Sequence, residues 1–122
     1  MKSLLFALLI VPVAAGLADI SRALGSGNAD ALGQYLDNSV EISVLDQENV
    51  YTKAQAVQVI RQFFTKNPPR NFSLVHQGAS KGSDSEYCIG NLTTANGSFR
   101  VYLYMKVTGT NYLIQELRFD QE

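Results

Sequence analysis

Cysteine and histidine are scarce in this sequence, and their scarcity excludes several kinds of site. The 122 residues include one cysteine, Cys88, and one histidine, His76. A single cysteine excludes an internal disulfide and a cysteine-rich metal centre, and a single histidine excludes the multi-histidine zinc motifs. The acidic cluster around Asp46 and Glu48 lacks the spacing of a calcium loop. We therefore expect neither a metal site nor a cofactor.

An excess of positive charge is also missing. Ten lysines and arginines stand against 11 aspartates and glutamates, which gives a formal net charge of −1. Proteins that bind nucleic acid need basic residues to neutralise phosphates, so we do not expect a nucleic-acid partner. Hydrophobic residues make up 46% and charged residues 17% of the chain, which excludes a disordered protein. The length fits one globular domain.

The longest apolar run lies at the N-terminus. It extends from Ser3 to Val13, after the single positive charge of Lys2, and small residues follow it. This order is typical of a secretory signal peptide. A membrane-spanning helix needs about 20 apolar residues, more than this run provides. The alternative is a buried N-terminal helix, which Pro12 would interrupt.

Two cleavage positions fit the small residues that follow the apolar run. Cleavage after Ala15 would use Val13 and Ala15, and cleavage after Ala18 would use Gly16 and Ala18. We assign residues 1–18 to the signal peptide and residues 19–122 to a single domain. The mature protein is then expected in the periplasm or outside the cell, with no stable membrane anchor.

Helical patterns dominate the first half of the remaining chain and strand patterns the second. We expect short helices over residues 19–24 and 29–36, the second capped by Asn28. A longer helix begins at Thr52, which forms a capping box with Gln55, and ends near Lys66. Alternating apolar residues predict a strand over residues 40–44, and residues 50–51 form a short return strand. From Asn71 onward the chain is expected to form strands.

The register of the last strands follows from one turn. The dipeptide Asn96-Gly97 predicts a two-residue hairpin turn that pairs Ala95 with Ser98. Counting outward gives each strand two faces, and a slip of one residue would put its apolar side chains on the wrong face. The inner face, toward the helices, is predicted to carry Leu92, Val101, Leu103, Met105, Leu113, Leu117 and Phe119.

The opposite, outer face combines tyrosines, isoleucines and charges. Tyrosine and arginine are enriched in protein interfaces. We therefore predict an interface, and with it a homodimer, on this face; a solvated face of good strand formers is the alternative. The predicted interface residues are Tyr87, Ile89, Arg100, Tyr102, Tyr104, Ile114 and Glu116, and Tyr112 is expected on the same side.

The order of these elements resembles the nuclear transport factor 2-like superfamily, also described as a cystatin-like cone. More narrowly, the chain resembles a family of small exported bacterial proteins of unknown function. The resemblance rests on DISRALGSGNADAL from Asp19, YTKAQAVQVIRQFFTKNPP from Tyr51, FSLVHQGAS from Phe72, YCIGNLTTANGSFRVYLYMK from Tyr87 and IQELRF from Ile114. It implies an α+β fold in which a curved antiparallel sheet wraps around the N-terminal helices and one long helix, usually with a pocket.

Several enzymes of this superfamily carry out proton transfer inside the cone, with an Asp or His base. Here the predicted cavity residues are His76, Cys88, Gln115 and Tyr35. His76 is the one catalytic candidate; a structural histidine near Gly78 is the alternative. Cys88 could pair with His76 as a nucleophile or simply pack beside Met105.

These observations favour an exported non-catalytic domain that forms a homodimer and binds a small apolar ligand in the cone. Two alternatives stay open. One is an isomerase, dehydratase or hydrolase that uses His76. The other is a module that binds another envelope protein through the tyrosine-rich outer face.

Overall fold

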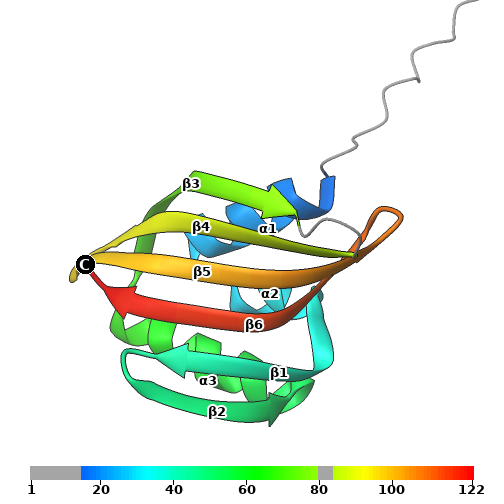
Figure 1. The fold of residues 1–122 in the computed structure, drawn as a ribbon. Helices are drawn as coiled ribbons and strands as arrows, with labels where there is room; N and C mark the ends of the chain where they lie inside the picture. Colours follow the sequence, from blue (N-terminus) through cyan, green and yellow to red (C-terminus); the bar gives the residue numbers. More distant parts are fainter. Residues whose placement is uncertain (1–14, 80–83) are drawn as a thin grey trace, which may run out of the picture.

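Three helices cover one face of a six-stranded sheet in the computed structural model, which describes residues 15–79 and 84–122 (Figure 1). The helices are α1 (Ala15–Ser26), α2 (Ala29–Gly33) and α3 (Lys53–Lys66). The strands are β1 (Leu36–Val44), β2 (Gln47–Thr52), β3 (Pro69–Ala79), β4 (Ser85–Thr94), β5 (Gly97–Thr108) and β6 (Asn111–Gln121). The first 14 residues, and with them most of the predicted signal peptide, lie outside the described ranges.

The strand order in the sheet is β2-β1-β6-β5-β4-β3. Neighbouring strands are antiparallel except β1 and β6, which pair in parallel. The predicted α+β class, with a curved sheet around helices, is confirmed. The expected purely antiparallel pairing is corrected at β1, because the chain returns to it only after five further elements and enters β6 in the same direction. No helix in the described part of the chain is long and apolar enough to cross a membrane.

Local signals set the helix ends. Gly27, at φ +70°, turns the chain out of α1, and the Asn28 amide donates to the Ala23 carbonyl at 2.9 Å. The Asn28 side chain then accepts from the Ala31 amide, as predicted for a cap of α2. This helix ends at Gly33, before the predicted residue 36, where Gly33 packs so closely that an added Cβ would lie 2.6 Å from Val57.

The long helix α3 begins and ends where the sequence predicts. The Thr52 hydroxyl accepts from the Gln55 amide at 3.2 Å, and the Gln55 side chain accepts from the Thr52 amide at 3.1 Å. Both bonds of the capping box are therefore present. The helix ends at the C-cap residue Asn67, because Pro68 and Pro69 follow it and proline cannot continue a helix.

The core lies between the helices and the inner face of the sheet. Phe63 of α3 stacks on Phe119 of β6 with ring centroids 4.2 Å apart and meets the edge of Phe99 at 5.1 Å. The predicted inner residues that are buried include Leu92, Val101, Leu103, Met105, Leu117 and Phe119. The predicted parity of β4 and β5 is therefore confirmed.

The predicted turn between β4 and β5 is displaced. The central residues are Ala95 and Asn96, so Thr94 pairs with Gly97. Gly97 takes a positive φ of 113°. Leu45, in another turn, is the one non-glycine residue in the described ranges with a positive φ, so the central residues Ala95 and Asn96 both have negative φ. A type I′ turn would need positive φ at both central residues. The displacement moves the register by two residues, which leaves every side chain on its predicted face.

A β-bulge in β6 corrects the predicted faces of three residues. Tyr104 pairs with Glu116 but the next residue, Met105, pairs with Ile114, so Gln115 is an extra residue. An extra residue reverses the side-chain alternation before it. Ile114 is therefore fully buried, whereas Leu113 is only partly buried. Tyr112 likewise packs toward α1, where its ring contacts Gly16.

Candidate functional site

A cavity of about 520 Å³ lies between the β1–β2 hairpin and α3. Small-molecule sites in proteins commonly have volumes of about 300–1,000 Å³. Its apolar lining comes from Ile42, Val44, Val59 and Phe63. Ile42 and Phe63 are buried, whereas Val44 and Val59 are half-buried. The cavity therefore has an apolar floor that belongs to the core.

Polar side chains form the rim of this cavity. Gln47 and Gln62 are exposed, Tyr51 is half-buried, and Lys66 stands in the last turn of α3. Among the described residues that line the cavity, Lys66 carries the one full charge. An apolar floor with one cation at the rim suits a ligand that has an apolar body and an anionic end.

Leu45 completes the rim in an unfavourable backbone conformation. It stands at φ 52°, and its side chain is 42% exposed. The left-handed region costs an L residue other than glycine roughly 1–2 kcal/mol. Its amide donates to the Phe119 carbonyl at 2.8 Å, which ties the hairpin turn to β6. An apolar side chain is thus held at the mouth of the cavity despite its backbone cost.

The predicted cavity residue His76 lies on the outer face instead. In β3, Leu74 pairs with Gly90 but His76 pairs with Ile89, so Val75 is an extra residue. This bulge turns His76 away from the helices, which corrects its predicted position in the cavity. The imidazole is exposed, and its Nε2 lies 3.1 Å from the hydroxyl oxygen of Tyr87. A role for His76 inside the cone is therefore excluded by its orientation.

Cys88 lies on the inner face, so it does not share a face with His76. It is fully buried. Burial, and after it the charge of Glu86, raise the pKa of the Cys88 thiol to about 11. A nucleophilic cysteine needs a lowered pKa. The predicted alternative of a small core residue is the one that fits this structure.

Gln115 and Tyr35 also lie away from the cavity. The Gln115 amide donates to Asp37 at 3.2 Å from the bulge in β6. This bond, and after it one from the Asn38 amide, lower the pKa of Asp37. The four predicted cavity residues thus occupy four separate places, and the predicted cavity is wrong in its membership.

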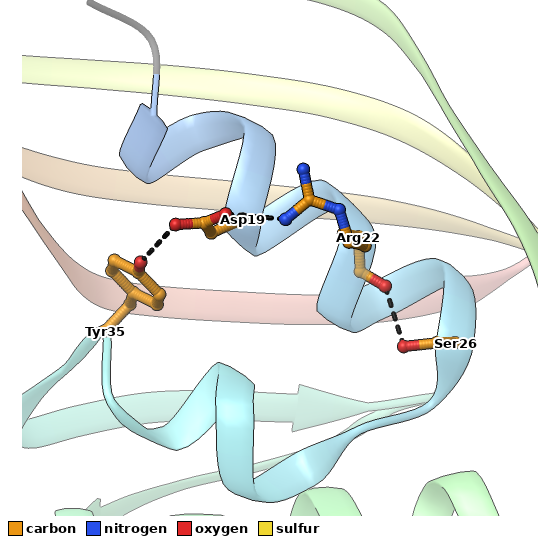
Figure 2. A network of polar contacts seen from close by, with 4 residues as sticks. All are labelled: Asp19, Arg22, Ser26 and Tyr35. Atoms are coloured by element: carbon orange, nitrogen blue, oxygen red, sulfur yellow. Dashed lines mark hydrogen bonds and ion pairs between the residues drawn. The ribbon is translucent and has the colours of Figure 1, made fainter. Parts of the chain in front are cut away.

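Tyr35 belongs to a polar network between α1 and the start of β1. Figure 2 shows Asp19 between Tyr35 and Arg22. The Tyr35 hydroxyl donates to Asp19 at 2.9 Å, and Arg22 donates to the other carboxylate oxygen at 2.6 Å. Hydrogen bonds from Arg22 and then Tyr35 lower the pKa of Asp19, while burial and this bond raise the pKa of Tyr35. The network ties α1 to the sheet.

The predicted interface residues lie on the outer face, except for the buried Ile114. Tyr87 and Tyr104 are 37% and 39% exposed and pair directly with each other. Arg118 lies over the Tyr102 ring, 5.3 Å from its centroid. A hollow of about 210 Å³ is lined by Tyr87, Ile89, Tyr102, Tyr104, Glu116 and Arg118, together with Cys88 and Leu103 beneath them. Arg100 bonds Asn91 and Glu122 on the same face.

Acidic residues gather at one side of this outer face. The carboxylates of Glu41, Glu48 and Glu116, from β1, β2 and β6, lie within 4.8 Å of one another. We assign no ion to them, because exposed carboxylates cluster without one. The basic residues of this face are distributed differently: Arg100 on β5 forms an ion pair with Glu122 at 2.7 Å, Arg118 on β6 forms one with Asp120 at 3.0 Å, and Lys106 stands near the end of β5.

The residues that line the large cavity carry a weak sequence signal. Val59, Phe63 and Lys66 repeat at intervals of three to four residues, which puts them on one side of α3. Ile42 and Val44 alternate on β1, but nothing in the sequence shows that this hairpin stands apart from α3. The cavity is created by that separation rather than by any motif.

The arrangement of sheet and helices defines the class of fold. A nuclear transport factor 2-like protein of unknown function from Cytophaga hutchinsonii aligns with a TM-score of 0.61 at 10% identity, over 93% of this chain and 94% of that one. A domain of unknown function with a cystatin-like fold from Nostoc punctiforme aligns with a TM-score of 0.68 at 7% identity, over 90% of this chain and 75% of that one. The predicted superfamily fold is thereby confirmed.

Within that class the chain belongs to the DUF4783 family, a domain of unknown function whose family model matches residues 17–120. A crystal structure of a DUF4783 family protein from Bacteroides ovatus aligns with a TM-score of 0.80 at 31% identity, over 86% of this chain and 94% of that one. No curated protein matches the sequence. The predicted membership in a family of unknown function is confirmed.

Proposed function

We propose that this protein is an exported, non-catalytic domain that binds a small apolar ligand between the β1–β2 hairpin and α3. The cavity of about 520 Å³ with its apolar floor carries this proposal. Among the described lining residues there is neither a carboxylate nor an imidazole, the usual general acids and bases. Lys66 at the rim favours a ligand with an anionic end.

Fluorescence of 8-anilinonaphthalene-1-sulfonate, an aromatic anion, tests this cavity. Val59→Trp fills the apolar floor, and we expect at least a tenfold loss of probe affinity. The matched control is Val50→Trp, because Val50 is 68% exposed and pairs with Glu41 on the outer face. Equal affinity in the two variants would contradict binding in this cavity.

The anionic preference has its own pair of variants. Lys66→Gln removes the charge at the rim, whereas Lys53→Gln removes an exposed charge at the opposite end of α3. We expect weaker probe binding in the Lys66 variant alone. Similar affinities in both variants would leave the cavity without a charge preference.

Export is supported by the apolar run from Ser3 to Val13 and the small residues after it. Expression of the complete chain in a bacterium with a secretory pathway, followed by fractionation, tests it. A shortened product in the periplasm is expected. A full-length product confined to the cytoplasm would refute export.

We propose further that two copies associate through the outer face. In a two-fold dimer the same patch meets itself, so the acidic cluster of Glu41 and Glu116 on one copy can face Lys106 of the other. The exposed tyrosines Tyr87 and Tyr104, on β4 and β5 of the same face, would add apolar contact area to this interface. This surface also fits the alternative partner, another envelope protein.

Light scattering decides between self-association and a monomer. Tyr102→Glu places a charge at the centre of the patch, where burying it unpaired is costly, so the dimer is expected to weaken. Gln58→Glu adds the same charge on the exposed side of α3 and serves as control. A strict monomer at high micromolar concentration would refute the dimer and leave the envelope partner as the remaining use of this face.

A further inference from the structure

We infer that the leader is removed between Ala15 and Gly16, so that the mature protein begins at Gly16. This inference rests on the proposed export. A membrane-bound signal peptidase would hydrolyse the peptide bond: one water is consumed, Ala15 keeps the new carboxylate, and Gly16 carries the new amino group. The alternative position, after Ala18, was equally compatible with the small residues in the sequence.

Leu17 belongs to the core and not to the leader. It is 6% exposed and lies in the same cluster of buried residues as Ile20 and Leu24. The spacing of these three residues puts them on one face of α1. Cleavage after Ala18 would remove the first buried residue of that face. Cleavage after Ala15 would leave it in place.

The packing of the fold requires a small residue at position 16, whether or not a peptidase recognises it. A Cβ added to it would lie 2.6 Å from Cδ1 of Tyr112, so the close approach of α1 to β6 requires glycine here. Ala18 is an exposed residue of the same helix, where alanine is the strongest helix former. The fold therefore explains why Gly16 and Ala18 are small. Val13 and Ala15 remain as the pair of small residues that the signal peptidase would recognise.

The position of Asp19 agrees with this boundary. Its carboxylate accepts from both Tyr35 and Arg22 (Figure 2). Cleavage after Ala18 would make Asp19 the terminal residue, where helix ends fray. With Gly16 to Ala18 retained, the network stands inside the first turns of α1.

The experiment is N-terminal sequencing and intact mass of the processed protein from a bacterial host, expressed with its complete leader. Ala15→Leu places a bulky residue at the cleaved bond and should abolish processing. Ala18→Leu is the matched control, and it should be processed like the wild type because residue 18 is exposed. A mature protein that begins at Asp19, with processing blocked by Ala18→Leu alone, would overturn the inference while leaving export intact. Unprocessed protein confined to the cytoplasm would overturn both.

A second variant gives an independent result. Leu17→Ala should lower the melting temperature of the processed protein, because residue 17 is retained and buried. If processing occurred after Ala18, the mature variant would be identical to the mature wild type. Identical melting temperatures would therefore also overturn the inference.

Discussion

Leu45 is the residue at which backbone preference and position conflict most clearly. Its φ of 52° suits glycine or asparagine, yet an exposed leucine occupies it at the cavity rim. Strained residues often persist at functional sites because the surrounding structure holds them there. The conflict is explained if the leucine side chain covers an apolar ligand.

Leu45→Asn is therefore expected to raise the stability of the fold and lower ligand affinity. Asparagine tolerates the left-handed region, so unfolding should need about 0.5–1 kcal/mol more. Urea unfolding measures the first effect and 8-anilinonaphthalene-1-sulfonate fluorescence the second. If the variant lost stability, the leucine would contribute packing that outweighs its backbone strain.

The bond between Tyr35 and Asp19 should make stability depend on pH. Because the fold lowers the pKa of Asp19, its contribution is present above the ordinary value of 3.8 and is lost as pH falls below it. Tyr35→Phe removes one of the two hydrogen bonds that cause this shift. We expect its melting temperature to lie below that of the wild type near pH 7 and to approach it in strong acid. Tyr104→Phe, on the outer face, should show no such convergence.

At the scale of elements, the two bulges determine which side chains face the cone. Without Gln115 as an extra residue, Ile114 would point outward and Leu113 inward. Without Val75, His76 would point toward the helices. The bulges thus remove the one imidazole from the interior and place Ile114 there instead of Leu113.

Deletion of Gln115 should be far more harmful than its truncation. The deletion restores regular alternation, which turns Ile114 toward solvent and Leu113 into the space that Ile114 fills. The lost burial of Ile114 costs about 1.5–3 kcal/mol, of which the differently shaped Leu113 recovers only part. Gln115→Ala keeps the backbone bulge and loses only the bond to Asp37. Thermal unfolding of the two variants compares these effects. Equal stability would mean that β6 tolerates either alternation.

The elements themselves were largely predictable, whereas the bulges were not. Thr52 with Gln55, Asn28, and the apolar alternation of β5 specify caps and faces through local chemistry. A bulge is set by how a strand fits two neighbours at once, and the residues at Gln115 and Val75 carry no distinguishing local signal. One parity error at each of these positions accounts for the wrong faces of Ile114 and His76.

The cavity was beyond sequence analysis for a related reason. Its lining combines residues of β1, the β1–β2 turn and α3, which no single periodic pattern in the sequence connects. Apolar periodicity shows that Phe63 and Ile42 are buried, but not that a space separates their neighbours. A fold of this class implies a pocket without saying which residues line it.

For the whole molecule, charge should control the proposed dimer. The formal net charge is only −1, so association does not have to overcome strong overall repulsion. The charged side chains that would attract each other across the interface stand at the protein surface, and at 0.1 M salt such attraction is largely screened beyond about 10 Å. Sedimentation at rising salt concentration should therefore show a weakening dimer. A dimer that strengthens with salt would instead point to an association dominated by the tyrosines.

The most direct test of the account is an amide NMR titration of the protein with 8-anilinonaphthalene-1-sulfonate. We predict that the shifted amides belong to Ile42, Leu45, Val59, Phe63 and Lys66, which surround the cavity between the β1–β2 hairpin and α3. Amide shifts confined to the outer face, around Tyr102 and Tyr104, would contradict it.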